Sequence, residues 1–212
     1  MGNKDLRNFR QEYKLNNLEK DKVPADPLVL FHQWLEAAID QGLTEPNAMT
    51  LATVNSDGNP AARVVLLKEI FHGRFVFYTN YESNKGRELE ANPNAALVFL
   101  WLEMQRQVRV SGWVERVSTA MSDEYFAQRP EESRLGAVIS PQSRPVSRRE
   151  ELEKAFRELQ KQKATVSRPP HWGGYQLWPE QIEFWQGREN RLHDRILYSR
   201  KGKSWEILRL AP

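Results

Sequence analysis

Two short segments of the chain bring chemically active side chains close together, and the denser of them is RLHDR. It runs from Arg191 to Arg195, holds two arginines, a histidine and an aspartate, and closely follows the apolar run IEFW. Arg and His side chains together can hold an anion and can move or orient a proton near neutral pH. A solvent-exposed turn would have the same composition, so both interpretations stay open for this segment.

The second segment places cations inside an otherwise apolar strand. Arg63 and Lys68 enclose four aliphatic residues in the run RVVLLK. An edge strand that faces solvent would also show this pattern, because charges on edge strands prevent aggregation. The functional interpretation is phosphate binding, since a phosphorylated small molecule requires only local positive charge.

Several catalytic and metal-binding signatures are missing from the sequence. It has no GxGxxG, P-loop, HExxH or GxSxG motif, which leaves dinucleotide-binding, kinase and hydrolase interpretations without support. The four histidines are scattered without metal-ligand spacing, so we expect no metal site. The sequence has no Cys, which excludes disulfides and thiolate chemistry and fits a reducing cytoplasm.

The charge and hydropathy patterns argue against membrane and nucleic-acid partners. The first residues lack the apolar core of a signal peptide, and no apolar run approaches the ~18 residues that span a bilayer. The formal net charge is +3, but Lys and Arg are interspersed with Asp and Glu rather than gathered in one run. We therefore expect a cytoplasmic protein that binds small molecules, with no membrane and no nucleic-acid partner.

The N-terminal part of the chain differs in composition from the rest. Residues 1–22 are polar and predict a mobile arm, whereas residues 23–212 predict a single domain. Asp26 and Pro27 are typical of a helix start, and Gly42 predicts the end of that helix.

The elements that must position the two segments are mostly strands. A period of two residues and β-branched side chains predict strands over 49–54, 62–70, 74–79, 95–102, 106–117, 175–178, 181–187, 195–200 and 204–210. Helices are predicted over 83–92, 119–128, 134–139 and 147–163, the last of them in solvent. This pattern indicates a mainly β fold with peripheral helices (α+β), in the form of a closed or split barrel.

Five motifs occur in an order that resembles the pyridoxine/pyridoxamine 5'-phosphate oxidase family. They are RVVLLK, FYTN with the SNKG that follows, the late pair QS, EFWQG and RLHDR, and the terminal LRLAP is similar as well. The resemblance covers the chain from about Arg10 to Pro212. It implies an antiparallel, Greek-key type split β-barrel that binds FMN at the interface of a homodimer.

The resemblance also implies an activity in vitamin B6 salvage and biosynthesis. Members of this family oxidise pyridoxine 5'-phosphate and pyridoxamine 5'-phosphate to pyridoxal 5'-phosphate with O2 as acceptor, and release hydrogen peroxide, with ammonia from the amine. By matching position, contacts to FMN are expected from Arg63, Val64, Val65, Leu66, Leu67, Lys68, Tyr78, Thr79, Asn84, Lys85, Gln107, Gln142, Ser143, Trp185 and Arg195.

Substrate contacts carry over from the resemblance in the same way. They fall on Arg10, Gln11, Glu12 and Tyr13 of an N-terminal lid, and on Lys68, Tyr125, Arg129, Ser133, Arg191, Leu192 and His193. Arg191 and His193 are expected to be catalytic, by orienting the substrate and assisting proton removal at C4'. Gln11 and Asn84 stand where the family commonly has Arg, which lowers the positive charge at the lid and near the FMN phosphate.

Two other functions stay open. Another split-barrel flavin oxidoreductase would keep FMN but act on a different substrate, although RLHDR together with Arg129 and Ser133 argues against it. A non-catalytic carrier of FMN or pyridoxal phosphate would keep the pocket without turnover. Peroxide formation coupled to product formation would separate these functions from the oxidase.

Overall fold

The computed structural model describes residues 12–162 and 166–212, which form two compact units. The first unit combines the described part of Met1–Pro46 with Val98–Val110 and Glu180–Pro212. The second combines Asn47–Leu97 with Ser111–Pro179. The single domain expected over 23–212 stays a prediction.

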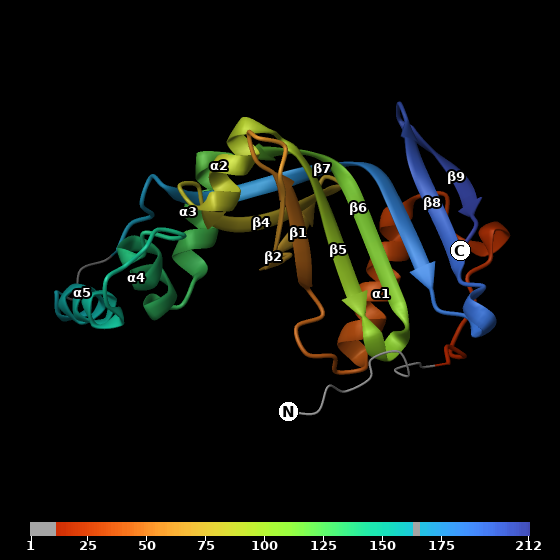
Figure 1. Ribbon diagram of the computed structural model, residues 1–212, viewed down its shortest axis with the longest axis horizontal. Helices are drawn as coiled ribbons and strands as arrows, with labels where there is room; N and C mark the ends of the chain where they lie inside the picture. The colour runs from red at the N-terminus through yellow and green to blue at the C-terminus, as the bar shows by residue number, and fades with distance from the viewer. Residues whose placement is uncertain (1–11, 163–165) are drawn as a thin grey trace. The chain divides into compact units, whose positions relative to one another are not determined.

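Antiparallel β-structure dominates the described residues, as the sequence predicts (Figure 1). The strands are β1 (Ala48–Val54), β2 (Pro60–Leu66), β3 (Glu69–Phe71), β4 (Arg74–Asn80), β5 (Asn94–Trp101), β6 (Arg106–Arg116), β7 (Trp172–Gln186), β8 (Asp194–Lys201) and β9 (Ser204–Leu210). Hydrogen-bonded neighbours follow the order β2-β1-β5-β6-β7-β4-β3, and β8 pairs with β7 and β9. The mainly β class is thus confirmed.

In the described part of the chain, five α-helices accompany the strands. They are α1 (Pro27–Asp40), α2 (Asn84–Ala91), α3 (Thr119–Gln128), α4 (Glu131–Ile139) and α5 (Arg149–Lys161), and short 3-10 turns occur at η2 (Lys20–Lys22), η3 (Leu102–Met104) and η4 (Glu189–Arg191). The predicted caps are confirmed: Asp26 accepts a hydrogen bond from the Leu28 backbone N–H at 2.9 Å, and Ser83 accepts one from Gly86. Figure 1 shows α4 and α5 side by side, and α5 has no buried residue.

In two places the strand prediction is wrong in more than the end residues of a strand. The run predicted as one strand over 62–70 is interrupted, because the backbone N–H of Leu67 bonds to Asn47 O and that of Lys68 bonds to Val76 O. The runs predicted as separate strands over 175–178 and 181–187 belong to one long strand, β7. Both corrections arise from pairing with residues that are distant in the sequence.

Each unit has an aromatic core. In the first unit the rings of Phe31 and Phe99 meet edge to face at 4.9 Å, and both side chains are fully buried. In the second unit Phe77 on β4 stacks with Tyr175 on β7 at 5.7 Å. Burial of such large rings supplies most of the stability of a fold of this kind, and it fixes the strands that carry the candidate site residues.

Candidate active site

The second unit contains a cavity of about 560 Å³ at the end of β2, beside β4, α2 and α3. Eleven of the residues that the sequence predicts for cofactor or substrate line it, namely Val64, Val65, Leu66, Lys68, Tyr78, Thr79, Lys85, Tyr125, Arg129, Ser133 and Gln142. The cavity therefore gathers predicted residues from five separate stretches of the chain. Its remaining lining residues are Gln128, Pro130 and Trp172.

One corner of the cavity is built around Lys85 at the N-terminus of α2. Its ammonium group donates to Gln142 Oε1 at 3.0 Å and to Ser83 Oγ at 3.2 Å, and Thr79 Oγ1 donates to the same Gln142 oxygen at 3.3 Å. Burial, followed by the nearby charge of Arg63, lowers the pKa of Lys85. A cation, two hydroxyls and a helix N-terminus together form a suitable environment for a phosphate group.

Arg63 does not line this cavity, because its guanidinium group binds a carboxylate. Its Nη2 atom lies 2.7 Å from Glu88 Oε2, and its Nη1 atom donates to Thr53 Oγ1. Burial pushes the pKa of Glu88 upward, but the hydrogen bonds from Thr53 and Arg63 outweigh burial, and the pKa lies below its usual value. The predicted contact of Arg63 with a phosphate stays a prediction.

Three aromatic rings form a wall of the cavity. The rings of Tyr78 and Tyr125 stack at 3.8 Å with 13° between their planes, and Trp172 lies nearly parallel to both. The guanidinium carbon of Arg129 lies 4.5 Å from the Trp172 ring centroid. Flat apolar rings next to a planar cation suit a flat, charged aromatic ligand.

Two buried polar atoms at this wall have no hydrogen-bond partner within the part of the chain that the structure describes. They are Tyr78 Oη and Arg129 Nη1. Burial raises the pKa of the Tyr78 hydroxyl and lowers that of the Arg129 guanidinium. Because buried polar groups in proteins are nearly always satisfied, these two atoms are candidates for hydrogen bonds to a ligand in the cavity.

Sequence reasoning missed Trp172, although a local signal was present. Trp172 precedes Gly173 and Gly174, and a Cβ atom on Gly174 would lie 2.7 Å from Tyr78 Cε1. A glycine is therefore needed for the Tyr78 ring to reach its place in the wall. The adjacent glycines directly after a tryptophan could have indicated close packing of rings at this point.

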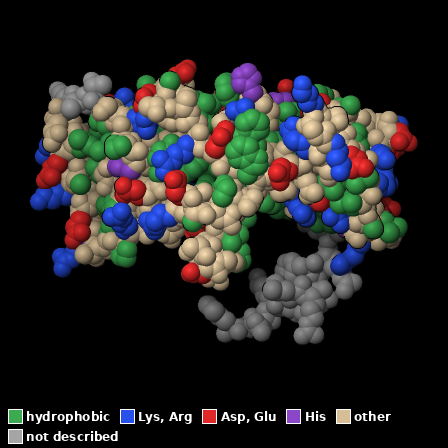
Figure 2. Space-filling model, turned by 90° about the horizontal axis from the view of Figure 1, so that it is seen from above, with side chains coloured by type: hydrophobic (Ala, Val, Ile, Leu, Met, Phe, Trp, Pro, Cys, Tyr) green, Lys and Arg blue, Asp and Glu red, His purple; other side chains and the backbone are tan. Residues whose placement is uncertain are grey.

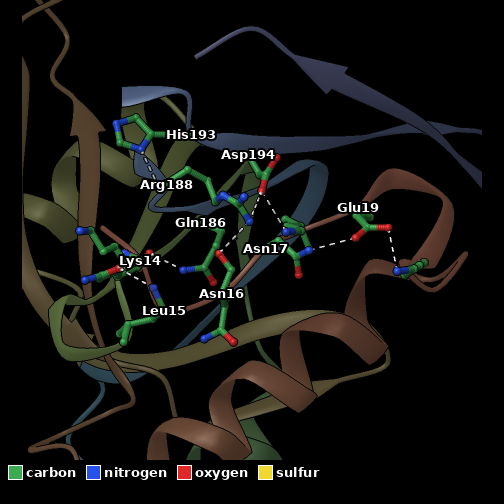
Figure 3. A network of polar contacts seen from close by, with 12 residues as sticks. Lys14, Leu15, Asn16, Asn17, Glu19, Gln186, Arg188, His193 and Asp194 are labelled. Carbon is green, nitrogen blue, oxygen red and sulfur yellow. Dashed lines mark hydrogen bonds and ion pairs between the residues drawn. The ribbon is translucent and has the colours of Figure 1, made fainter. Parts of the chain in front are cut away.

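A second group of predicted residues lies in the first unit, around His193, which Figure 3 shows beside Arg188. The His193 ring is 4.6 Å from the Trp185 ring and 5.6 Å from the Tyr13 ring, measured between centroids. Its Nδ1 atom accepts a hydrogen bond from the backbone N–H of Arg188 at 3.1 Å. Since a backbone N–H can only donate, Nδ1 carries no proton and the neutral ring holds its proton on Nε2.

The charge state and setting of His193 follow from its neighbours. Burial lowers the pKa of His193, and the positive charge of Arg191 adds to this effect. Arg191 and Asn190 adopt left-handed backbone angles, with φ of 61° and 54°. Non-glycine residues in this region are strained and concentrate at functional sites. The neutral imidazole can thus donate a hydrogen bond through Nε2, beside an exposed arginine.

Of the remaining predicted residues of the first unit, Arg195 has structural partners of its own. Arg195 on β8 donates to Glu183 Oε1 at 2.9 Å and to Ala211 O at 2.8 Å. Gln107 is half-buried on β6, and Leu192 is 69% exposed. In the second unit, Leu67 is buried, Asn84 Oδ1 accepts from Arg87 Nη2 at 2.6 Å, and Ser143 is exposed with φ of 69°.

The predicted lid is described only in part. Arg10 and Gln11 lie outside the described residues, whereas Glu12 is exposed and forms an ion pair with Lys14 at 2.5 Å. Tyr13 packs against Trp185, His193 and Gly187. Of the predicted lid residues, Tyr13 is thus in contact with the candidate catalytic histidine.

Comparison with known proteins decides the family. Residues 35–163 match the family described as pyridoxamine 5'-phosphate oxidase. The chain belongs to the pyridoxamine 5'-phosphate oxidase family. Residues 172–212 match the pyridoxine 5'-phosphate oxidase C-terminal dimerisation region, so the chain also has the dimerisation segment of this family. The resemblance drawn from motif order is confirmed.

Curated relatives in the pyridoxamine 5'-phosphate oxidase family match over nearly the whole chain. A pyridoxine/pyridoxamine 5'-phosphate oxidase of Rubrobacter xylanophilus is 54% identical over 99% of this chain and 97% of its own length. One of Microcystis aeruginosa is 54% identical and covers 98% of each chain. In each relative, only a few residues lie outside the match.

Two solved structures agree with the fold. PhzG of Burkholderia lata 383, solved in complex with tetrahydrophenazine-1-carboxylic acid, has a TM-score of 0.90, with 32% identity over 95% of this chain and 100% of its own. A pyridoxamine 5'-phosphate oxidase-related, FMN binding protein of Nostoc punctiforme has a TM-score of 0.71, with 18% identity over 90% of this chain and 98% of its own. The predicted split-barrel fold is confirmed.

Two further findings concern metal ligands and membrane-spanning helices. Within residues 12–162 and 166–212, no three His, Asp or Glu side chains come together in a way that could hold a metal ion. Over the same residues, every helix is too short or too polar to cross a bilayer.

Proposed function

We propose that this protein is an FMN-dependent oxidase that converts pyridoxine 5'-phosphate and pyridoxamine 5'-phosphate to pyridoxal 5'-phosphate. The observation that supports it most is the cavity of the second unit, where Lys85 with Gln142 and Arg129 with Ser133 provide two separate polar regions. A flavin phosphate and a substrate phosphate need two such regions. Membership in the oxidase family supports the same reaction.

The residues around Lys85 fit FMN. Lys85, Thr79 and the N-terminus of α2 would hold the FMN phosphate. Lys85 and Thr79 now donate to Gln142, so the Gln142 side chain would move to let them donate to the phosphate as well. Val64 is 66% exposed on β2, which lies at the end of the strand order, so its backbone and side chain are accessible to a flat ring. When bound, FMN supplies two-electron oxidation, with O2 as final acceptor and hydrogen peroxide as its product.

Arg129 fits the phosphate of the substrate. Its Nη1 atom is buried without a partner among the described residues, while its guanidinium plane is held against Trp172. Tyr125, Lys68 and Ser133 line the same cavity and would add two hydroxyl groups and a second cation. Such a set binds the phosphate and so positions the attached pyridine ring, without taking part in the reaction itself.

His193 and Arg191 are proposed to orient the reacting end of the substrate. The Nδ1 atom of His193 is occupied by the Arg188 N–H, so the ring offers its Nε2–H as a hydrogen-bond donor. Arg191 is exposed beside it and adds a fixed positive charge. Assistance with proton removal at C4' would require His193 Nδ1 to release Arg188, and orientation requires no such change.

We further propose that the enzyme works in the cytoplasm as a homodimer in which each site takes residues from both chains. The C-terminal segment supports dimerisation, because residues 172–212 match the dimerisation region of the family. Lys and Arg side chains are interspersed with Asp and Glu over the face shown in Figure 2. This mixed distribution supports small-molecule partners rather than nucleic acid.

The test is a product assay on the FMN-loaded protein in air. Pyridoxine 5'-phosphate should yield pyridoxal 5'-phosphate and hydrogen peroxide in equal amounts, and Arg191→Ala should lose most of this activity while keeping FMN. A yellow protein that forms neither product would favour a carrier. Oxidation of a tetrahydrophenazine carboxylic acid in place of both vitamin phosphates would assign a different flavin reaction.

A further inference from the structure

Arg188 is a half-buried residue between β7 and β8 that binds two different parts of the first unit. Its backbone N–H donates to Nδ1 of His193 at 3.1 Å. Its Nη1 atom donates to the backbone carbonyl of Asn16 at 3.3 Å and lies 3.9 Å from Asp194 Oδ2 (Figure 3). One residue thus contacts both the candidate catalytic histidine and the N-terminal segment.

The N-terminal segment Tyr13–Leu18 has no regular secondary structure and depends on a few side-chain contacts. The backbone N–H of Lys14 donates to Gln105 Oε1 at 3.0 Å, and that of Leu18 donates to Asp194 Oδ2 at 3.0 Å. Arg188 holds the segment between these two points, through Asn16. Arg209 Nη2 also donates to the Leu18 carbonyl at 2.9 Å. A segment that is held by side chains rather than by a backbone ladder opens locally at low cost, so each contact affects its position.

The position of this segment matters to His193 because Tyr13 packs on it. The Tyr13 ring meets the His193 ring at 5.6 Å and close to perpendicular, at 73°. Tyr13 also packs against Gly187, the neighbour of Arg188, where an added Cβ atom would lie 2.8 Å from Tyr13 Cγ. The loop around Arg188 and the segment therefore enclose the imidazole from two sides.

We infer that Arg188 is a positioning residue that couples the docking of segment Tyr13–Leu18 to the orientation of His193. Its side chain fixes the segment, and its backbone N–H fixes the proton of His193 on Nε2. Loss of the side-chain contact releases the segment and loosens the loop, which weakens the hold on the imidazole. The effect on catalysis rests on the proposed function, whereas the coupling itself does not.

The experiment compares Arg188→Ala with Arg188→Lys in the FMN-loaded protein, and with Lys203→Ala as a control that removes a charge from an exposed turn of the same unit. Hydrogen exchange at the Lys14 and Leu18 amides should speed up about 3- to 10-fold in Arg188→Ala, because a charged hydrogen bond is lost. Nitrogen NMR of His193 should show a larger fraction of the Nδ1-protonated tautomer. Arg188→Lys should change the amide exchange rates and the His193 tautomer less than Arg188→Ala does. Lys203→Ala should match the wild type in both measurements.

The kinetic readout separates the inference from the proposed function. With pyridoxine 5'-phosphate, Arg188→Ala should raise KM about 3- to 10-fold and change kcat less, since a positioning contact rather than a reacting group is lost. Faster amide exchange with an unchanged His193 tautomer would overturn the coupling, as would no change in exchange. If the wild type produced no pyridoxal 5'-phosphate, the proposed function would fail while exchange and NMR would still decide the coupling.

Discussion

The guanidinium group of Arg63 lies 2.7 Å from the carboxylate of Glu88, so a cation expected to bind the flavin phosphate already has a partner. Both side chains are largely buried, with 21% and 13% exposed. Glu88 also acts on Lys85, whose pKa its charge raises against the effect of burial. The negative charge of Glu88 therefore acts on both Arg63 and Lys85, and Lys85 is the cation at the proposed phosphate position.

Glu88→Gln should tighten FMN binding and weaken the fold. Removal of one negative charge near the phosphate should lower the Kd for FMN about 3- to 10-fold. It should also cost about 1–3 kcal/mol of unfolding free energy, since the partly buried Arg63 donors lose a carboxylate partner. Flavin fluorescence titration and urea unfolding measure the two effects. Glu90→Gln, in the exposed pair with Arg116, is the matched control, and equal Kd values for both variants would contradict the prediction.

Lys85→Met should weaken FMN binding. Lys85 provides the cation of the cavity corner and binds both Gln142 and Ser83. Loss of a charge-assisted hydrogen bond of about 1.5–3 kcal/mol corresponds to a Kd about 10- to 100-fold higher. Lys154→Met on the exposed helix α5 removes the same charge and should leave the Kd unchanged. If both variants bound FMN like the wild type, Lys85 would have no role in holding the phosphate.

Arg129→Met should affect phosphorylated substrates selectively. Arg129 packs on Trp172, and its Nη1 atom has no partner among the described residues, so we expect this side chain to bind an anion. KM for pyridoxine 5'-phosphate should rise about 10- to 100-fold, while that for unphosphorylated pyridoxine should stay within about 2-fold. Arg144→Met, which removes an exposed cation of the same unit, is the control. An equal increase in KM for both substrates would place Arg129 away from the phosphate.

Gly187→Ala should disturb Tyr13. The added Cβ atom would lie 2.8 Å from Tyr13 Cγ, closer than van der Waals contact allows, so the ring must move. We expect KM for the substrate to rise about 3- to 10-fold with FMN affinity unchanged, because the displaced ring covers His193 less well. Gly136→Ala has nothing within 4 Å of its added Cβ and serves as the control. A crystal structure with Tyr13 unmoved would refute this explanation.

His193 should make activity and stability fall on acidification. Its pKa is below 6.5 in the folded protein, so the unfolded chain binds the proton more readily. The stability contribution is complete above about pH 6.5 and is lost as the pH falls through the folded pKa. Activity should decline over the same range, since protonation at Nδ1 breaks the bond to Arg188. NMR titration of the His193 ring gives the folded pKa, and a value above 6.5 would reverse the sign.

Local signals predicted most of the fold. Asp26 and Ser83 cap their helices as their types suggest, and α3 has the predicted bounds Thr119–Gln128. The residues predicted as two strands form one, because β7 pairs with β4 before Pro179 and with β8 after it. Proline usually marks a strand end, and here the strand changes partners across it, so neither of these two ladders is interrupted. Periodicity along the chain cannot show such a change of partner.

The candidate site was predicted by motif order more than by local chemistry. The cavity gathers Lys68, Lys85 and Arg129, which lie far apart in the sequence, and only the fold brings them together. Glu88 escaped notice because its partner Arg63 is 25 residues away. The role of Arg188 was also hidden, since it depends on a backbone N–H whose direction the sequence does not encode.

The most direct test of the proposed oxidase activity is an anaerobic titration of the FMN-loaded protein with pyridoxine 5'-phosphate. If the protein is the proposed oxidase, the visible absorbance of the bound flavin should bleach and about one pyridoxal 5'-phosphate should form per flavin. The colour should return when air is admitted, with release of hydrogen peroxide. An absorbance that stays unchanged with both pyridoxine 5'-phosphate and pyridoxamine 5'-phosphate, in protein that has bound FMN, would contradict the proposed oxidase activity.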